Sequence, residues 1–295
     1  MAERDGLLVV DKPMGLTSFD IIRKVRKVAD MRKVGHTGTL DPDATGVLAV
    51  ALGRCTKLSR FLVFDEKRYV FTMRLGEATD TDDASGEVIR EAAWDGVNRE
   101  DFEAKLPRFI GNVEQVPPIF SAIKVDGKRA YALARAGDEV QLESRQVRID
   151  DVRITRWALP EIDLEVTCGP GTYIRSLARD LGEAVGSAAH TTMIRRLSVG
   201  PFSIEQAVDL EVLTVSNFWS HALTPLEMVQ SLPRYEVDEE MGKRIHHGQP
   251  IEVAGPWEAG ASIAAHDCNE RLVAVMECRS RQAGQAQLWP KRVMS

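Results

Sequence analysis

Cysteine is scarce in this sequence, and no spacing of ligand residues suggests a metal. The four cysteines form no Cys-x-x-Cys pair and lie far apart: Cys55, Cys168, Cys268 and Cys278. In a chain of 295 residues this scatter argues against a disulfide framework and against a zinc site. The six histidines show no His-Glu-x-x-His or comparable arrangement. We therefore expect no metal in the chemistry.

Long apolar runs are missing as well. The most apolar stretch, residues 47–52, is far shorter than the roughly 20 residues needed to span a bilayer. The N-terminus carries no cleavage-type signal. We therefore expect a soluble, cytoplasmic protein without a membrane partner. The composition, 44% hydrophobic and 28% charged, is ordinary for a globular chain, and the length favours two domains of roughly 150 residues each.

The net charge of −6 does not by itself suggest a nucleic-acid partner. Positive charge is nevertheless concentrated near the N-terminus, where the first 70 residues carry 13 Lys and Arg against 9 Asp and Glu. The densest cluster is Arg23, Lys24, Arg26, Lys27, Arg32 and Lys33. An acidic protein can bind RNA through one locally basic face. A solvated helix face explains the charge pattern equally well.

The chain mixes strands and helices without regular alternation, which predicts an α+β fold with a mostly antiparallel sheet. Strands are expected at residues 7–10, 47–52, 68–75 and 163–167. Three helices are expected: one capped by Thr17 or Ser18 with apolar positions from Ile21 to Ala29, one at residues 98–109 with Asn98 as cap and Gly111 as stop, and one at residues 174–185. After a boundary near Leu232 and Pro233, short strand-like runs alternate with turn residues, which is typical of a small β-rich module.

The segment GHTGTLDPDATG, residues 35–46, is the most unusual stretch. It places Asp41 between glycines and directly before Pro42. Glycine permits close approach of the backbone to a ligand, and proline stiffens the turn that presents the aspartate. From the residues alone, the favoured alternative is a structural turn in which the carboxylate caps backbone N–H groups.

Five further segments carry motifs in the same chain: residues 12–18 (KPMGLTS), 67–69 (KRY), 117–128 (PPIFSAIKVDGK), 171–182 (GTYIRSLARDLG) and 189–197 (AHTTMIRRL). Together with the loop at residues 35–46 they resemble, in the same order, the TruB family of tRNA pseudouridine-55 synthases. The aspartate of that family's signature loop is its nucleophile. The resemblance covers nearly the whole catalytic region, and it reverses the preference for a merely structural turn at Asp41.

The resemblance implies a fold and a domain organisation. We expect a pseudouridine-synthase-type mixed, mostly antiparallel sheet with flanking helices, plus a small C-terminal β-rich domain. Residues 1–232 would form the catalytic domain, with an RNA-contacting insertion at about 116–145. Residues 233–295 resemble, more weakly, a PUA-like RNA-binding domain, judged from Gly248 and from residues 272–277 and 288–293.

The resemblance also assigns the catalytic residues. Asp41 would be the nucleophile, because a carboxylate can form a covalent intermediate that divides the reaction into easier steps. Arg175 would lie beside it as an ion-pair partner that favours the charged carboxylate. Tyr69 would stack on the target base, and Tyr173 would line the same pocket.

Binding residues follow from the same resemblance. His36 would serve RNA recognition and base flipping rather than the chemical step. Ile194, where the family usually has leucine, would form a pocket wall. Lys12, the basic helix and the segment 124–135, including Lys124 and Lys128, are candidates for phosphate contacts.

Two departures from the family pattern concern affinity more than chemistry. The chain has Gly169 and Pro170 where the family usually has Ser-Lys, so a positive charge is missing there. Asp43 stands after Pro42 where an apolar residue is more usual.

These features predict an enzyme that isomerises uridine 55 in the T-loop of tRNAs to pseudouridine by base flipping and Asp nucleophilic catalysis. Isomerisation involves no redox change or group transfer, so no cofactor is expected. The inserted segment at residues 116–137 favours direct recognition of the RNA, so no guide RNA is expected, and we expect a monomer. Two alternatives remain open: a guide-RNA-dependent pseudouridylase subunit and a non-catalytic tRNA-folding chaperone. A carboxylate-based hydrolase would need a second acid to activate water, and no motif identifies one.

Overall fold

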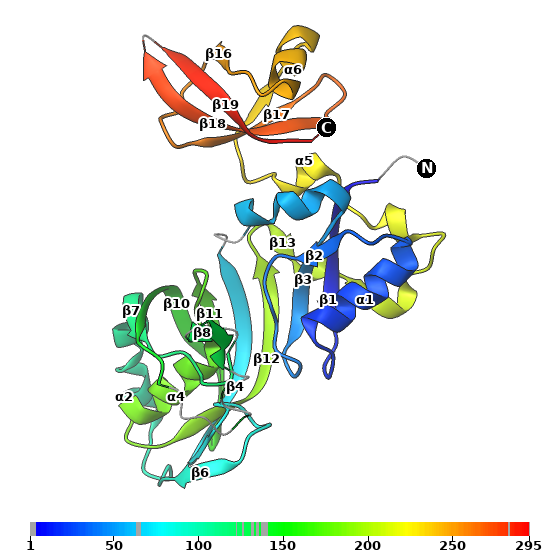
Figure 1. Ribbon diagram of the computed structural model, residues 1–295. Coiled ribbons are helices and arrows are strands. Elements are labelled where there is room, and N and C mark those ends of the chain that lie inside the picture. Colours follow the sequence, from blue (N-terminus) through cyan, green and yellow to red (C-terminus); the bar gives the residue numbers. More distant parts are fainter. Residues whose placement is uncertain are drawn as a thin grey trace.

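The computed structural model describes residues 4–62, 66–121, 123–125, 127–130, 133, 136, 141–282 and 284–294. In this part of the chain a large sheet forms the body of the molecule, and a smaller sheet follows at the C-terminal end (Figure 1). The chain passes between them through short helical segments. No helix within the described ranges is long and apolar enough to cross a bilayer.

The large sheet has ten strands among the described residues, in the order β14-β1-β3-β12-β4-β11-β10-β7, with β2 beside β3 and β13 beside β12. Only the β1–β14 and β3–β12 contacts in this sheet are parallel, so the predicted α+β class with a mostly antiparallel sheet is confirmed. The strands are β1 Gly6–Lys12, β2 Val34–His36, β3 Thr45–Leu52, β4 Lys67–Leu75, β7 Gly111–Gln115, β10 Arg145–Ala158, β11 Glu161–Cys168, β12 Ala189–Val199, β13 Phe202–Ser203 and β14 Val208–Asp209.

Strands β1 and β3 are apolar at nearly every position because both of their faces are buried. Successive side chains of a strand point to opposite faces. Leu8 and Val10 therefore pack under the first helix, while Leu7 and Val9 pack into a second apolar cluster on the other face. This double burial explains the unbroken apolar run of residues 47–52.

Helix α1 (Ser18–Ala29) covers one face of these strands. Thr17 is its N-cap and forms a capping box with Asp20, which satisfies backbone N–H groups that have no partner within the helix. Ile21, Ile22 and Val25 are buried against the sheet. The predicted first helix is therefore confirmed, with Thr17 rather than Ser18 as its cap.

Helix α4 (Ile174–Ala184) covers the other half of the sheet. Its buried residues Ile174, Leu177, Ala178 and Leu181 share one cluster with the inward side chains of β4 and β11. The helical periodicity at residues 174–185 predicts this helix correctly. Its first turn follows the carboxyl end of β11 and carries Arg175 and Ser176.

The expected helix from Asn98 to Phe109 is wrong in its length. Asn98 does cap a helix, α2, but this helix spans only Arg99–Glu103. The chain then continues as a 3₁₀ turn at Leu106–Phe109 with proline near its start. Proline lacks an N–H group and clashes with the preceding helical turn, so Pro107 ends the α-helical hydrogen bonding.

The C-terminal sheet has the strand order β15-β17-β18-β19-β16. Its elements are β15 Arg234–Glu236, α6 Glu239–His246, β16 Ile251–Ala254, β17 Ser262–His266, β18 Leu272–Gln282 and β19 Gln285–Val293. The expected β-rich tail is confirmed, whereas helix α6, capped by Asp238, was not predicted. The sheet has an apolar core of its own.

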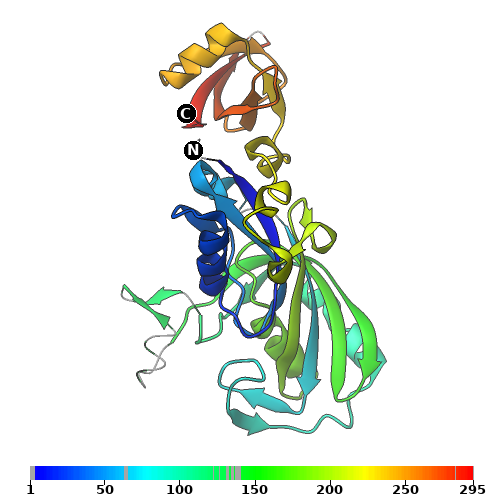
Figure 2. The ribbon, with the colours of Figure 1, turned by 90° about the vertical axis from the view of Figure 1, so that its right-hand side faces the viewer.

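The remaining described elements are short. The two small hairpins are β5 Glu77–Thr79 with β6 Val88–Glu91, and β8 Lys124–Val125 with β9 Lys128–Arg129. Figure 2 shows the β8–β9 hairpin extending away from the body on the side where α1 lies. The other segments are α5 Pro225–Met228 and 3₁₀ turns at Gly53–Lys57, Ser59–Phe61, Ile204–Gln206, Leu210–Val212 and Phe218–Ser220.

Strand β12 joins the two halves of the large sheet. It pairs with β4 along most of its length, but it meets β3 only at Arg195↔Thr45 and Arg196↔Gly46. Gly46 has φ +101°, and a Cβ atom there would lie 2.1 Å from the carbonyl oxygen of Arg196. The junction therefore requires glycine.

We expect Gly46→Ala to lower the free energy of unfolding by about 2–4 kcal/mol, through left-handed strain and overpacking. Urea denaturation of the purified protein would measure the loss. Gly96→Ala is the matched control, because a Cβ atom at Gly96 meets nothing within 4 Å. Equal stability of the two variants would contradict this account of the junction.

Candidate active site

A pocket of about 230 Å³ opens where the two halves of the sheet meet. Its walls come from four segments of the chain: the loop after β2, the loop between β5 and β6, the middle of β12, and the turn before α1. The lining residues are Met14, Asp41, Asp43, Ala44, Asp83, Ala84, Ser85, Thr191, Thr192, Met193 and Ile194. Asp41 and Ile194, both predicted site residues, thus line one pocket.

The loop between β2 and β3 holds Asp41, and its backbone is fixed at several points. Ser18 Oγ accepts a hydrogen bond from the Leu40 N–H at 2.9 Å and donates to the Leu40 carbonyl at 3.1 Å. The Gly15 N–H donates to the Pro42 carbonyl at 2.9 Å. Within the loop, the Ala44 N–H donates to the Asp41 carbonyl at 3.2 Å. The position of Asp41 is therefore held by backbone contacts on both of its sides.

Lys12 is a loop anchor in this structure rather than an exposed phosphate contact. Its side chain is fully buried, at 0% exposure. Its ammonium donates to the carbonyls of Pro13, Leu16 and Pro42 at 2.9, 2.6 and 2.9 Å. An ammonium has three N–H donors, so all of them are engaged. Burial lowers the pKa of Lys12 to about 8, while Asp43 and Asp41 nearby oppose the shift.

Arg196 anchors the opposite side of the same loop. It is 1% exposed, and its Nε donates to the Val47 carbonyl at 2.7 Å. Its Nη2 donates to the Gly38 carbonyl at 3.1 Å, and its Nη1 lies 3.5 Å from the Thr39 carbonyl. Two buried cations from different strands therefore bind carbonyl oxygens on either side of Asp41.

Arg175 contacts two carboxylates that line the pocket. Its Nε lies 3.0 Å from Asp41 Oδ2, and its Nη1 lies 3.4 Å from Asp83 Oδ2. Its Nη1 also donates to the Thr81 carbonyl at 2.8 Å, and its Nη2 donates to the Phe120 carbonyl at 3.0 Å. One guanidinium on α4 thus contacts the loop that carries Asp41, the 81–83 loop and the segment after Pro118.

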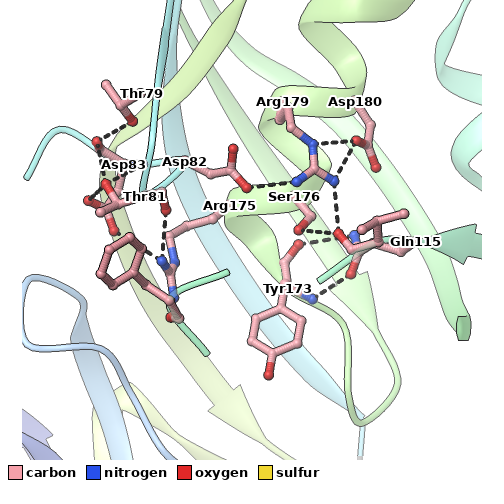
Figure 3. Close-up of polar contacts among 12 residues, drawn as sticks. Thr79, Thr81, Asp82, Asp83, Gln115, Tyr173, Arg175, Ser176, Arg179 and Asp180 are labelled. Carbon is pink, nitrogen blue, oxygen red and sulfur yellow. Dashed lines mark hydrogen bonds and ion pairs between the residues drawn. The ribbon is translucent and has the colours of Figure 1, made fainter. Parts of the chain in front are cut away.

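Helix α4 fixes these segments through a second arginine as well (Figure 3). Arg179 pairs with Asp82 at 2.8 Å and donates to the Val116 carbonyl at 2.8 Å. Ser176 Oγ donates to the same carbonyl at 2.9 Å. Burial raises the pKa of Asp82 to about 6, against the opposing pull of Arg179. The rigid helix therefore sets the position of Asp83 through its neighbour in sequence.

The charge state of Asp41 reflects competing influences. Burial raises the pKa of its carboxyl above the ordinary aspartate value, the Arg175 guanidinium pulls it down, and Asp83 pushes it up again. The side chain is still 42% exposed, so a ligand in the pocket can reach it. Arg175 thus favours the ionised form that a nucleophile needs.

Tyr69 lies beneath the loop that carries Asp41. It is buried in one apolar cluster with Leu40 and Ala44, and it pairs across the sheet with Arg196. Burial raises the pKa of its phenol, and the Arg196 guanidinium opposes that shift. Its phenol therefore stays protonated at neutral pH.

Tyr173 is placed differently from the pocket position expected for it. It is not among the residues that line the pocket. Its ring lies under the Arg145 guanidinium, 4.8 Å from that cation, and its backbone is held by the Gln115 side chain. Figure 3 shows its hydroxyl pointing away from the polar network. The residue is the N-cap of α4, two residues before Arg175.

His36 ends β2 five residues before Asp41. Its Nδ1 is buried without a hydrogen-bond partner. Burial and the nearby Arg196 lower its pKa, so its imidazole is neutral at pH 7. Lys124 and Lys128 lie on the β8–β9 hairpin, but their side chains lie outside the described residues.

Sequence reasoning missed the roles of Asp83, Arg179 and Arg196. The acidic run at residues 80–83 and the Arg195-Arg196 pair were visible in the sequence, yet charged runs are usually solvated. Only the fold shows that these side chains point inward. Among the described residues there is no group of three or more His, Cys, Asp or Glu that could hold a metal ion.

Comparison with known proteins decides the family. Residues 26–174 match the model for the TruB family pseudouridylate synthase N-terminal domain, and residues 175–230 match that for the tRNA pseudouridylate synthase B C-terminal domain. The chain belongs to the TruB family. It is therefore a pseudouridylate synthase, and the matched residues include Asp41, Tyr69 and Arg175.

Curated relatives of this TruB-family chain extend over nearly its whole length. It is 47% identical to the tRNA pseudouridine synthase B of Ruegeria sp. (strain TM1040), over 86% of each chain. It is 42% identical to that of Rhodococcus jostii (strain RHA1), over 94% of this chain and 92% of the relative. With that of Burkholderia pseudomallei (strain 668) the identity is 40%, over 100% and 99%.

Solved structures share the TruB-family fold at lower identity. A chain of a Cbf5-Nop10-Gar1 complex matches with a TM-score of 0.77 at 24% identity, over 98% of this chain and 85% of that one. A chain of an H/ACA RNP bound to a substrate RNA containing 2′-deoxyuridine matches with a TM-score of 0.76 at 23% identity, over the same shares. These similarities show that the fold extends through the C-terminal sheet.

The raised pKa of Asp41 makes a prediction about stability. A carboxyl whose folded pKa lies above its unfolded value favours folding at low pH and loses that contribution as pH rises through the folded pKa. Asp41→Asn removes the ionisation, so we expect it to be at least as stable as the wild type at pH 7.5, with an advantage that grows between pH 4 and neutrality. Urea denaturation across this range would measure it.

Asp163→Asn is the control of opposite sign. Its pKa is lowered chiefly by the hydrogen bond from Arg156, so we expect this variant to lose stability at neutral pH and to recover as pH falls. An Asp41→Asn variant that is clearly less stable than the wild type at pH 7.5 would contradict the raised pKa of Asp41.

Proposed function

We propose that this enzyme converts uridine 55 in the T-loop of tRNAs to pseudouridine, with Asp41 as the nucleophile and without guide RNA or cofactor. The observation that carries the proposal is the Asp41–Arg175 pair at 3.0 Å, in which Asp41 lines the pocket. The curated relatives, all named tRNA pseudouridine synthase B, support the substrate class.

The chemistry needs only groups that the pocket supplies. The bond between ribose C1′ and N1 of uracil breaks, the base turns, and C1′ bonds to C5. A proton leaves C5 and N1 gains one, so the atoms balance without any co-reactant. The Asp41 carboxylate forms a covalent intermediate with the nucleotide, and the rigid loop with Arg175 holds that carboxylate in place without reorganisation during the reaction.

Base flipping explains the shape of the site. A stacked uridine inside an RNA cannot reach a carboxylate in a pocket, so it must leave the stack. Asp41 is reachable from solvent, Ile194 and Met193 offer apolar wall, and Tyr69 lies beneath the loop as the proposed stacking partner. Tyr173 marks the edge of the site through its stack with Arg145.

We propose a division of labour along the chain. Residues 1–232 form the catalytic domain, the insertion at 116–145 contacts the RNA, and residues 233–295 form a PUA-like RNA-binding domain. In support of the boundary, the family match ends at residue 230 and the second sheet begins at Arg234. Because the pocket is complete within one chain, we further propose that the enzyme works as a monomer, in the cytoplasm where tRNAs are modified.

The activity can be tested on unmodified tRNA transcript whose uridines carry tritium at C5. We expect the purified protein alone to release one tritium per transcript, because pseudouridine formation removes the C5 hydrogen. Asp41→Asn should reduce release to background, and Asp43→Asn, two residues along the same loop, should retain most of it.

The outcomes separate the alternatives. A guide-RNA-dependent subunit would release tritium only after a guide is added. A folding chaperone would keep its effect on tRNA structure with Asp41→Asn and would release no tritium in either form. Release by Asp41→Asn at the wild-type rate would reject Asp41 as the nucleophile.

His36 should contribute to RNA binding or flipping rather than to the chemical step. We expect His36→Ala to weaken binding of T-loop RNA while single-turnover chemistry at saturating RNA is largely retained. Because the lowered pKa leaves the ring uncharged, the salt dependence of binding should not change, whereas Lys33→Gln should reduce it. Abolished turnover with normal binding would instead make His36 a catalytic residue.

A further inference from the structure

Phe19 is a large apolar side chain left exposed at the start of α1. It is 57% exposed, while the other apolar residues of this helix turn toward the sheet. Exposed single apolar residues are common on proteins, so exposure alone decides nothing. The position matters because the surroundings of this ring combine apolar surface, positive charge and the pocket.

The start of α1 does not need an aromatic ring for stability. Thr17 and Asp20 already form the capping box. Leu16 before the cap and Ile21 in the first turn both pack into the cluster under the helix, the arrangement of a hydrophobic staple. Phe19 belongs to none of the apolar clusters in the described part of the chain.

Two guanidinium groups flank the ring. Arg23 and Arg26 lie 5.8 and 6.0 Å from its centroid. Arg23 is also held by Asp20, and Arg26 donates to the Val34 carbonyl at 3.2 Å, so both cations have fixed positions. Further exposed cations continue along the same segment: Lys24, Lys27, Arg32 and Lys33. An aromatic face among cations is complementary to a base and its phosphates.

The helical turn that carries Phe19 is tied to the candidate active site through its neighbours in sequence. Its neighbour Ser18 is hydrogen-bonded to Leu40, the residue before Asp41. Met14, in the turn before α1, is 60% exposed and lines the pocket itself. The start of α1 is therefore connected to the pocket on both sides of the cap, through Met14 before it and through Ser18 after it.

We propose that Phe19 is a stacking platform for an unpaired base of the RNA loop next to the flipped nucleotide. Flipping removes one base from the stack and leaves its neighbour with one uncovered face. The Phe19 ring covers that face, and Arg23 with Lys24 contacts the phosphates on either side. This inference rests on the proposed function for the identity of the RNA.

The size of the effect follows from base stacking on aromatic residues. Removal of one such stack weakens single-strand binding by roughly 5- to 150-fold. Stacking is uncharged, so its loss leaves the salt dependence of binding unchanged, whereas loss of a phosphate contact reduces that dependence. A loss of affinity with unchanged salt dependence therefore indicates a stacking platform, and a reduced salt dependence indicates a phosphate-binding surface.

The test uses a T-loop stem-loop RNA with 2-aminopurine in place of the nucleotide after the target uridine. The Asp41→Asn background prevents turnover, so binding is measured alone. We expect the probe's fluorescence to be quenched on binding, and Phe19→Ala to remove most of that quenching and to raise Kd within the range above. Phe19→Trp should keep both the quenching and the affinity.

Two controls complete the design. Val215→Ala removes another exposed apolar side chain, 75% exposed, and should leave Kd and quenching unchanged. Lys24→Gln should reduce the salt dependence of Kd while the quenching remains. Phe19→Ala that binds with unchanged Kd and quenching, or that alters only the salt dependence, would overturn the platform.

The experiment is independent of catalysis. If the enzyme makes no pseudouridine in T-loop RNA, the tritium assay above fails while Phe19-dependent quenching can still be observed. If quenching fails while tritium is released, the platform is rejected and the proposed function stands.

Discussion

The architecture of the site depends on two buried cations that bind backbone carbonyls instead of carboxylates. Lys12 binds the Pro42 carbonyl on one side of Asp41, and Arg196 binds the Gly38 carbonyl on the other. A hydrogen bond from a charged donor is worth about 1.5–3 kcal/mol, and each carbonyl left without a partner would carry a desolvation cost. The loop is therefore fixed by contacts to its own backbone, which leave the Asp41 side chain free to pair with Arg175.

Among the charged groups around Asp41, the proposed nucleophile, Arg175 lowers the pKa of its carboxyl most strongly. Arg175 is shared between Asp41 and Asp83, so it cannot neutralise either carboxylate fully. Asp41 can still ionise. Asp83 orients the guanidinium from a loop that α4 holds through the Arg179–Asp82 ion pair. Positioning and charge tuning thus come from a single short helix, which packs on the sheet through an apolar face unrelated to the chemistry.

The sequence predicts the helices and strands better than it predicts the contacts between them. Capping at Thr17 and apolar periodicity predict α1 and α4 because these signals are local. The expected length of α2 is too great because Pro107 lies inside the expected helix and cannot continue its hydrogen bonding. The contact between Asp41 and Arg175 follows from the family resemblance alone, because the two residues are 134 positions apart in the chain and no local pattern connects them. Lys12 has the character of a surface cation in the sequence. Its burial among loop carbonyls produces no periodic pattern from which the burial could be predicted.

The seam between the two sheets restricts how this protein can be divided. Ala264, Leu272, Val275 and Met294 of the C-terminal sheet share an apolar cluster with residues of β1, β3 and α5 in the body. Arg60 adds a hydrogen bond to the Lys291 carbonyl across the same seam. Truncation before β15 would thus expose apolar surface on the remaining fragment and promote its aggregation. A shortened version for engineering would require polar replacements along that newly opened face.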